Sequence, residues 1–132
     1  MNRQPGLIVA IQNPEEREKL RKINADIMGR DGDPFYGAPT VLIVLVKADA
    51  FTGIYDGSLM MGNMMNAAHA LGLGSCWIHR AKETFEREDG KALLKEWGVE
   101  GDYIGIGHCI LGYADCDLPE ARERTSQVVI VK

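Results

Sequence analysis

Two amide side chains bracket a cation at the start of the chain, in the segment Asn2-Arg3-Gln4-Pro5. An amide presents both a hydrogen-bond donor and an acceptor, which is what the polar edge of a heteroaromatic ring requires. A polar terminus that frays and binds nothing has the same composition. The segment is therefore a candidate ring-binding site, with a frayed terminus as the alternative.

A second candidate is the loop of residues 70–78, which reads Ala-Leu-Gly-Leu-Gly-Ser-Cys-Trp-Ile. Because glycine has no Cβ, backbone amides in such a loop can come within hydrogen-bond distance of a ligand. The loop lacks the GxGxxG pattern of dinucleotide-binding turns, and it ends a helix instead of opening one. An ordinary helix stop is the alternative interpretation.

Two cations lie close together near the end of the chain, where Arg122 and Arg124 flank Glu123. In an extended segment, side chains two residues apart point the same way, so both guanidinium groups could clamp one phosphate. A solvated surface triplet is the alternative.

A polar seam runs along an otherwise apolar, Met-rich helix and consists of Asn63, Asn66 and His69. Buried polar groups require hydrogen-bond partners. We expect these partners to be backbone groups or a second subunit in preference to a ligand.

The cysteines do not indicate a metal site or a nucleophile. Cys76 and His79 form a CxxH pair, but Cys109 and Cys116 complete no spacing typical of zinc. No activating base is identifiable for Cys76, which is therefore expected to be a small core residue. An odd number of cysteines without CxxC pairing is typical of free thiols in a reducing compartment.

The elements that must position these residues alternate along the chain. Strands are predicted at residues 7–11, 40–46, 75–78, 104–110 and 128–131. Helices separate the first four strands, and a polar, charged connector precedes the last one. Asn13 as N-cap, Pro14 at the first helical position and Gly29 as stop predict the first helix. A sheet covered by helices follows from this order.

Two elements have patterns of their own. The helix that follows Asp56 or Ser58 as cap, residues 59–71, is apolar nearly all round and is predicted to be buried in the core or between subunits. In the strand 104–110, the alternation of side chains predicts that one face carries Ile104, Ile106, His108 and Ile110. Gly105 and Gly107 leave the opposite face bare.

Composition limits the class of protein. The 132 residues are enough for one domain. A net charge of −4 without a Lys/Arg cluster argues against nucleic-acid binding, and no apolar run reaches the roughly 18 residues of a membrane span. The start of the chain has no signal-peptide pattern, so a cytoplasmic location is expected.

Taken together, five features resemble the nitroreductase family in order and spacing along essentially the whole chain. They are Asn2-Arg3-Gln4-Pro5, Pro34-Phe35-Tyr36-Gly37-Ala38-Pro39, Asp56 with Asn63, the loop 70–78, and Leu111-Gly112-Tyr113. The Leu-Gly-Leu-Gly-Ser-Cys-Trp-Ile segment after an Ala-rich helix is the most specific of them.

The resemblance implies an α+β fold: a three-layer α-β-α sandwich with a mixed central sheet, formed by a single domain over residues 1–132. It implies a homodimer with FMN at the interface. It also implies that NADH or NADPH reduces the flavin, which passes hydride through N5 to a nitroaromatic, a quinone or a similar small-molecule acceptor in a ping-pong cycle.

The resemblance also assigns cofactor-binding residues in three groups, and no catalytic side chain. The pyrimidine side of the ring would meet Asn2 and Gln4, with Arg3 near them. Flavin N5 and O4 would face backbone amides around Ile78, His79 and Arg80, and Trp77 is a further cofactor-binding residue. The phosphate would be approached by Arg122 and Arg124.

The chain departs from the family at its start. Family subunits usually begin with an Arg-Arg-Ser-type segment that holds the FMN phosphate, and about 35 to 50 residues are expected to be missing here, judged from the size of such a domain. The alternative function is therefore a truncated, non-catalytic dimeric remnant with weak or no flavin binding. Reductive dehalogenation or flavin breakdown is a third possibility, for which the short connection 48–57 leaves little room for a lid.

Overall fold

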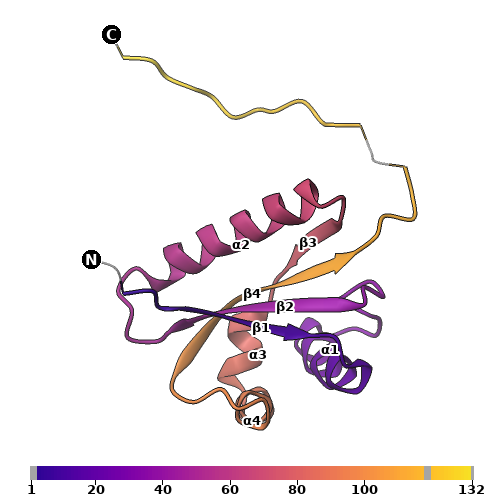
Figure 1. Ribbon diagram of the computed structural model, residues 1–132, viewed down its shortest axis with the longest axis vertical. Coiled ribbons are helices and arrows are strands. Elements are labelled where there is room, and N and C mark those ends of the chain that lie inside the picture. Colours follow the sequence, from indigo (N-terminus) through magenta and orange to yellow (C-terminus); the bar gives the residue numbers. More distant parts are fainter. Residues whose placement is uncertain (1–2, 118–119, 132) are drawn as a thin grey trace.

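The computed structural model describes residues 3–117 and 120–131. Four strands form one sheet in the order β1-β2-β4-β3: β1 (Gly6–Ile11), β2 (Thr40–Lys47), β4 (Tyr103–Gly112) and β3 (Gly74–Ile78). Helix α2 (Gly53–Ala70) covers one face, and α1 (Pro14–Met28), α3 (Ala81–Glu86) and α4 (Glu88–Glu96) cover the other (Figure 1). The predicted three-layer α+β sandwich is confirmed.

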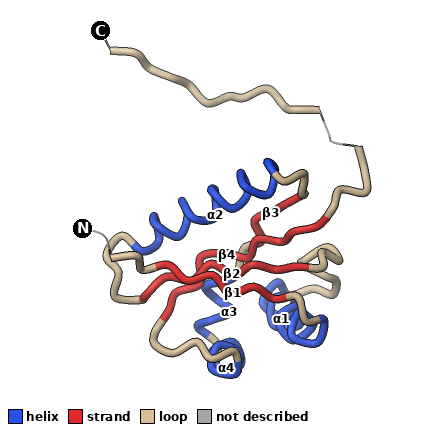
Figure 2. The backbone as a smooth tube through the Cα atoms, viewed as in Figure 1, coloured by secondary structure: helices blue, strands red, loops and turns tan. Residues whose placement is uncertain are grey.

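The sheet is antiparallel in every pairing among the described strands, so the mixed sheet expected from the resemblance is wrong for these residues. A parallel pair would need a further strand, and the one predicted at Val128–Val131 does not form. Residues 120–131 are exposed, carry no regular structure and run away from the body of the domain (Figure 2). Without a sheet edge beside it, the apolar run stays unpaired.

Local signals set the ends of α1 as predicted. The Asn13 side chain accepts hydrogen bonds from the backbone N–H groups of Glu15 (2.8 Å) and Glu16 (3.2 Å), and Pro14 occupies the first turn. Gly29 ends the helix with φ at 71°, in the left-handed region that glycine adopts without strain.

Helix α2 begins at Gly53, earlier than the predicted caps at Asp56 or Ser58. Contact with the sheet explains the difference, because the first two turns contain two buried glycines, Gly53 and Gly57, that let the helix lie close to β2 and β4. A Cβ added to Gly57 would lie 2.5 Å from Cγ1 of Ile106. The start of this helix is therefore set by packing against the sheet, because no side chain caps it.

A β-bulge in β4 changes which residues share a face. The register between β2 and β4 shifts at Ile106, which has no partner in β2. Ile106 packs under α2, whereas His108 and Ile110 face the opposite helices, so the prediction that these three share a face is wrong. Gly105 and Gly107 likewise lie on opposite faces.

Each face of the sheet has its own core. The larger core lies under α1, α3 and α4 and includes Leu20, Phe35, Ile43 and Phe85. The smaller one lies under α2 and is built around buried residues Val44, Met61 and Cys109, with further methionines packed against them. None of the helices in the described residues combines the length and hydropathy that a membrane span requires.

Candidate functional site

A cleft of about 720 Å³ lies between the N-terminal segment and the start of α2. It is lined by Arg3, Gln4, Pro5 and Gly6 on one side and by Ala50, Phe51, Thr52, Asp56 and Met60 on the other. Two of the predicted ring-binding residues, Arg3 and Gln4, therefore face a cavity. Asn2 lies outside the described residues.

The backbone around this cleft is fixed by a few contacts. The N–H of Lys47 donates to the carbonyl of Pro5 (3.0 Å), which ties the segment to the end of β2. Gln4 has a φ of 44°, in the left-handed region that residues with a Cβ rarely adopt. Phe51 is 97% exposed at the rim. The cleft thus combines a strained amide-bearing residue with an exposed aromatic ring.

Asp56 and Met60 form the helix side of the cleft. The Thr52 hydroxyl donates to the Asp56 carboxylate (2.8 Å). The sulfur of Met60 lies only 2.1 Å from where a Cβ on Gly6 would be. A side chain at position 6 would have to displace Met60, so glycine and methionine fit together here.

The second predicted segment, residues 70–78, contains the last residue of α2, a short turn and all of β3. The turn between β3 and α3 follows directly and holds two residues that the family resemblance assigns to the flavin, His79 and Arg80. Ile78 is buried at the end of β3, and the exposed His79 ring lies 5.9 Å from the indole of Trp77. Arg80 has φ 75° and ψ 13°, again the left-handed region. Its Nε donates to Oδ1 of Asn24 on α1 (2.9 Å).

Two backbone donors at this turn are unpaired. Within residues 3–117 and 120–131, the peptide N–H groups of His79 and Arg80 donate to no carbonyl or side chain. The carbonyl groups of the same two residues do have partners, since His79 accepts from Asn24 and Arg80 from Thr84. The turn can therefore offer two N–H groups to an acceptor atom on a ligand.

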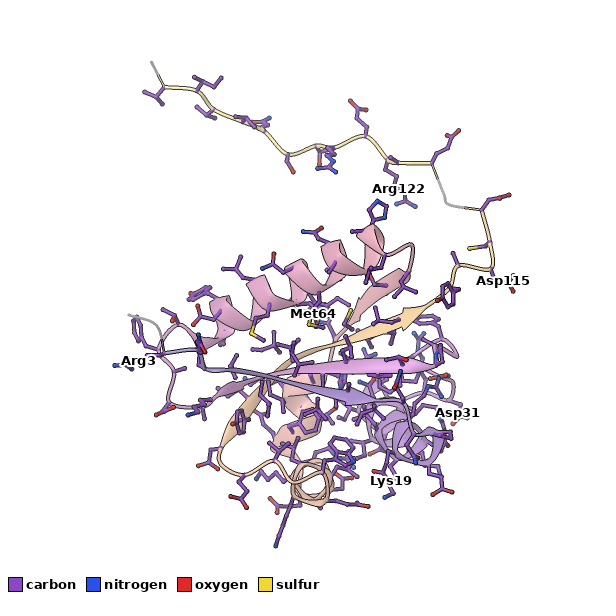
Figure 3. All side chains as sticks on the ribbon, viewed as in Figure 1. Arg3, Lys19, Asp31, Met64, Asp115 and Arg122 are labelled. Carbon is purple, nitrogen blue, oxygen red and sulfur yellow. The ribbon has the colours of Figure 1, made fainter. Side chains whose placement is uncertain are left out.

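The predicted phosphate-binding cations lie elsewhere in the single chain. Arg122 and Arg124 belong to the exposed tail, and Figure 3 shows Arg3 beside the first turn of α2 and Arg122 beyond its last turn. One chain therefore brings Arg3 and Gln4 together, holds His79 and Arg80 in a separate turn, and leaves the tail arginines apart from both.

The remaining candidates are placed as follows. Asn63, Asn66 and His69 are exposed on the outer side of α2. Cys76 is exposed because β3 is an edge strand, so its prediction as a core residue is wrong. Cys109 is buried, which raises the pKa of its thiol.

The three cysteines are free thiols. The described residues contain no group of three or more His, Cys, Asp or Glu side chains that could hold a metal ion.

The sequence pattern placed His108 on a strand face but did not reveal that its side chain is buried and that its pKa is lowered. The side chain is fully buried between Phe35 (ring centroids 5.4 Å apart) and Phe85 (6.2 Å). Neither ring nitrogen meets the geometry of a hydrogen bond with any group in the part of the chain that the structure describes. Burial lowers the pKa of His108 to about 4, with backbone groups of His79 and Ile78 opposing the shift. The imidazole is therefore neutral at physiological pH.

The family model described as "Nitroreductase family" matches residues 26–113, which is more than half of the chain. No functionally curated protein sequence is significantly similar to the chain.

Solved structures are similar along the whole chain. A nitroreductase with bound FMN from Bacteroides fragilis is 25% identical, with a TM-score of 0.88 over 100% of this chain and 79% of that one. A nitroreductase with bound FMN from Desulfitobacterium hafniense is 20% identical, with a TM-score of 0.83 over 100% and 78%.

An iodotyrosine deiodinase bound to FMN and 3-iodo-L-tyrosine is 18% identical, with a TM-score of 0.71 over 97% of this chain and 77% of that one. At such identity the likeness shows the fold alone.

Proposed function

The chain belongs to the nitroreductase family, and we propose that it is an FMN-dependent oxidoreductase. In this proposal NADH or NADPH is the electron donor, and the acceptor is a nitroaromatic compound, a quinone or a similar small molecule. Support comes from the family match and from similar structures that contain FMN.

The observation that carries the proposal is the pair of N–H groups at His79 and Arg80, which have no hydrogen-bond partner among the described residues. The edge of an isoalloxazine that carries N5 and O4 presents acceptor atoms, which fit two adjacent donors. A cation at position 80 adds positive potential beside them, which favours negative charge on a reduced ring. The residues present therefore fit the flavin.

The N-terminal segment supplies a second set of contacts. The Gln4 amide and the Arg3 guanidinium line the cleft, and they offer donors to ring carbonyl oxygens. When bound, FMN supplies the hydride acceptor for NADH or NADPH and the hydride donor for the second substrate. The chain's own residues bind the ring, orient it and set its electrostatic environment.

A second copy of the chain is part of the proposal. The outer side of α2 exposes Ile54, Tyr55 and Leu59, with 70% of Leu59 accessible. Exposed apolar side chains gathered on one helix mark an interaction surface. Pairing two copies through this surface would let residues that lie apart in one chain act on one flavin, and the exposed tail is free to reach across.

Arg122 and Arg124 are proposed to hold the FMN phosphate. Riboflavin lacks the phosphate, so the ratio of the dissociation constants for riboflavin and FMN isolates this contribution. Replacing both arginines with alanine is expected to weaken FMN binding and leave riboflavin binding unchanged. Equal weakening of both ligands would contradict the assignment.

Titration of the flavin-free protein with FMN tests the function itself. Saturable quenching of flavin fluorescence is expected, followed by FMN-dependent oxidation of NADH or NADPH when a quinone is added. Absence of saturation would overturn the proposal and leave the non-catalytic remnant as the interpretation. Binding without turnover would overturn the enzymatic part alone.

The change Leu59→Glu tests the pairing surface. It places a charge on the outer side of α2 without touching the core, so a dimer should become a monomer with unchanged helix content in circular dichroism. Gln12→Glu adds the same charge between β1 and α1 and should leave the dimer intact. A dimeric L59E protein in sedimentation would exclude this surface.

A further inference from the structure

Asn24 is a buried amide whose two polar atoms both bond to the turn between β3 and α3. It lies on α1 and is 0% exposed. Its Nδ2 donates to the carbonyl oxygen of His79 (3.1 Å), and its Oδ1 accepts from Nε of Arg80 (2.9 Å). A buried amide is tolerated only when both ends are satisfied, so these bonds couple the turn to α1.

The turn needs such a coupling because Arg80 is in a conformation that its Cβ disfavours. Left-handed backbone at a residue other than glycine persists only where surrounding contacts impose it. At Arg80 these contacts are the bond from Nε to Asn24 and two bonds that Thr84 donates to the Arg80 carbonyl, from Oγ1 (2.7 Å) and from N–H (2.9 Å).

All of these bonds engage the carbonyl groups and the side chain of the turn. The N–H groups of His79 and Arg80 are left unpaired in the part of the chain that the structure describes. Buried Asn24 is hydrogen-bonded to both of the residues that present those N–H groups.

We propose that Asn24 is a positioning residue for flavin binding. Through its two bonds it holds the turn in the left-handed conformation that presents the N–H groups of His79 and Arg80 to the ring. The inference rests on the proposed function, because the flavin is the group that these N–H groups would meet.

The first test compares Asn24→Ala with Asn13→Ala. Asn13 caps the same helix, so its removal destabilises α1 without touching the turn. N24A is expected to weaken FMN binding about tenfold, as for the loss of an aligned hydrogen bond, while N13A changes it less than about twofold. N24A should also shift the midpoint potential of the bound flavin, which a purely structural role would leave unchanged.

Arg80→Gly supplies the second arm of the test. Glycine adopts the left-handed conformation without strain, and the bond from Asn24 to the His79 carbonyl remains, so R80G should weaken FMN binding less than N24A. If both residues act on one turn, the double variant should bind FMN about as weakly as N24A alone. Additive losses would contradict the shared role.

Hydrogen exchange in the flavin-free protein separates this inference from the proposed function. The amides of His79 and Arg80 should change exchange rate and chemical shift in N24A and stay unchanged in N13A. If wild-type protein binds FMN but N24A binds it equally well with unchanged amides, the inference is overturned. If wild-type protein binds no FMN, the proposed function fails and the flavin role of Asn24 fails with it.

Discussion

The face of the sheet under α1, α3 and α4 and the face under α2 are held by different kinds of contacts. On the first face, polar side chains join separate elements: Asn24 bonds the β3–α3 turn, the Trp97 indole donates to Glu16 (2.7 Å), and Arg17 pairs with Asp33 (2.6 Å). On the second face, methionines such as Met64 fill the space between α2 and the sheet (Figure 3).

Helix α2 is also open on its outer side. In the described residues, its side-chain hydrogen bonds stay local, from Thr52 to Asp56 and from Ser58 to the Ile54 carbonyl. The contacts between α2 and the sheet are non-directional apolar packing. The apolar side chains on the outer side of α2 are exposed and can contact another surface. One side of the domain is therefore closed by polar contacts between elements of a single chain, whereas the other leaves the apolar side chains of Ile54, Tyr55 and Leu59 exposed.

The largest expected effect comes from adding a side-chain atom on the face of the sheet under α1, α3 and α4. A Cβ added at Gly105 would lie 2.2 Å from the carbonyl oxygen of Ala81, and this backbone atom cannot move aside cheaply. Gly105→Ala is expected to cost about 3 kcal/mol or more of unfolding free energy, measured by urea denaturation. An unchanged urea midpoint would show that α3 can move away from β4 at little cost in free energy.

The next largest expected effect is a pH dependence of the unfolding free energy that His108 causes. Its folded pKa of about 4 lies below the ordinary 6.5, so the unfolded chain binds more protons between these values and stability falls as pH drops through this window. The loss should total about 3 kcal/mol. His108→Leu removes the titrating group and should flatten the slope between pH 6.5 and 4. If the unfolding free energy of H108L depends on pH as steeply as that of the wild type, other titratable groups cause the dependence.

The smallest effect belongs to the open face. A Cβ added at Gly62 in α2 meets nothing within 4 Å. Gly62→Ala should therefore stabilise the monomer by up to about 1 kcal/mol through helix propensity, read from thermal unfolding at low protein concentration. Destabilisation would mean that the outer side of α2 is already covered in the monomer, which would remove the contrast between the faces.

Local signals made part of the fold predictable. The N-cap at Asn13 and the stop at Gly29 act within a few residues, so α1 was predicted with its ends. The bulge at Ile106 is only hinted at by the glycines on either side of it, Gly105 and Gly107, because glycine permits a bulge in a strand without fixing its position. It follows from β4 packing simultaneously against β2, α2 and α3, which only the assembled sheet imposes.

The candidate site was predictable as segments and not as an arrangement. Residue types placed Arg3 and Gln4 in a binding segment, and the resemblance to the family added His79 and Arg80. The left-handed backbone of Gln4 and Arg80 depends on tertiary contacts. Asn24 gave no sequence signal, since an asparagine within a helix has no pattern that reveals a partner 55 residues away. The distance of Arg122 from Arg3 depends on the path of the tail, which local patterns do not specify.

Sedimentation velocity, with detection in the visible absorption band of the flavin, tests whether FMN is bound between two copies of this chain. The flavin signal is expected to sediment with a species of twice the 14.6 kDa chain mass. In L59E the dimer should dissociate and the flavin should be released with it. Flavin that sediments with a monomer, or that stays free while the protein dimerises, would show that FMN is not bound between two copies.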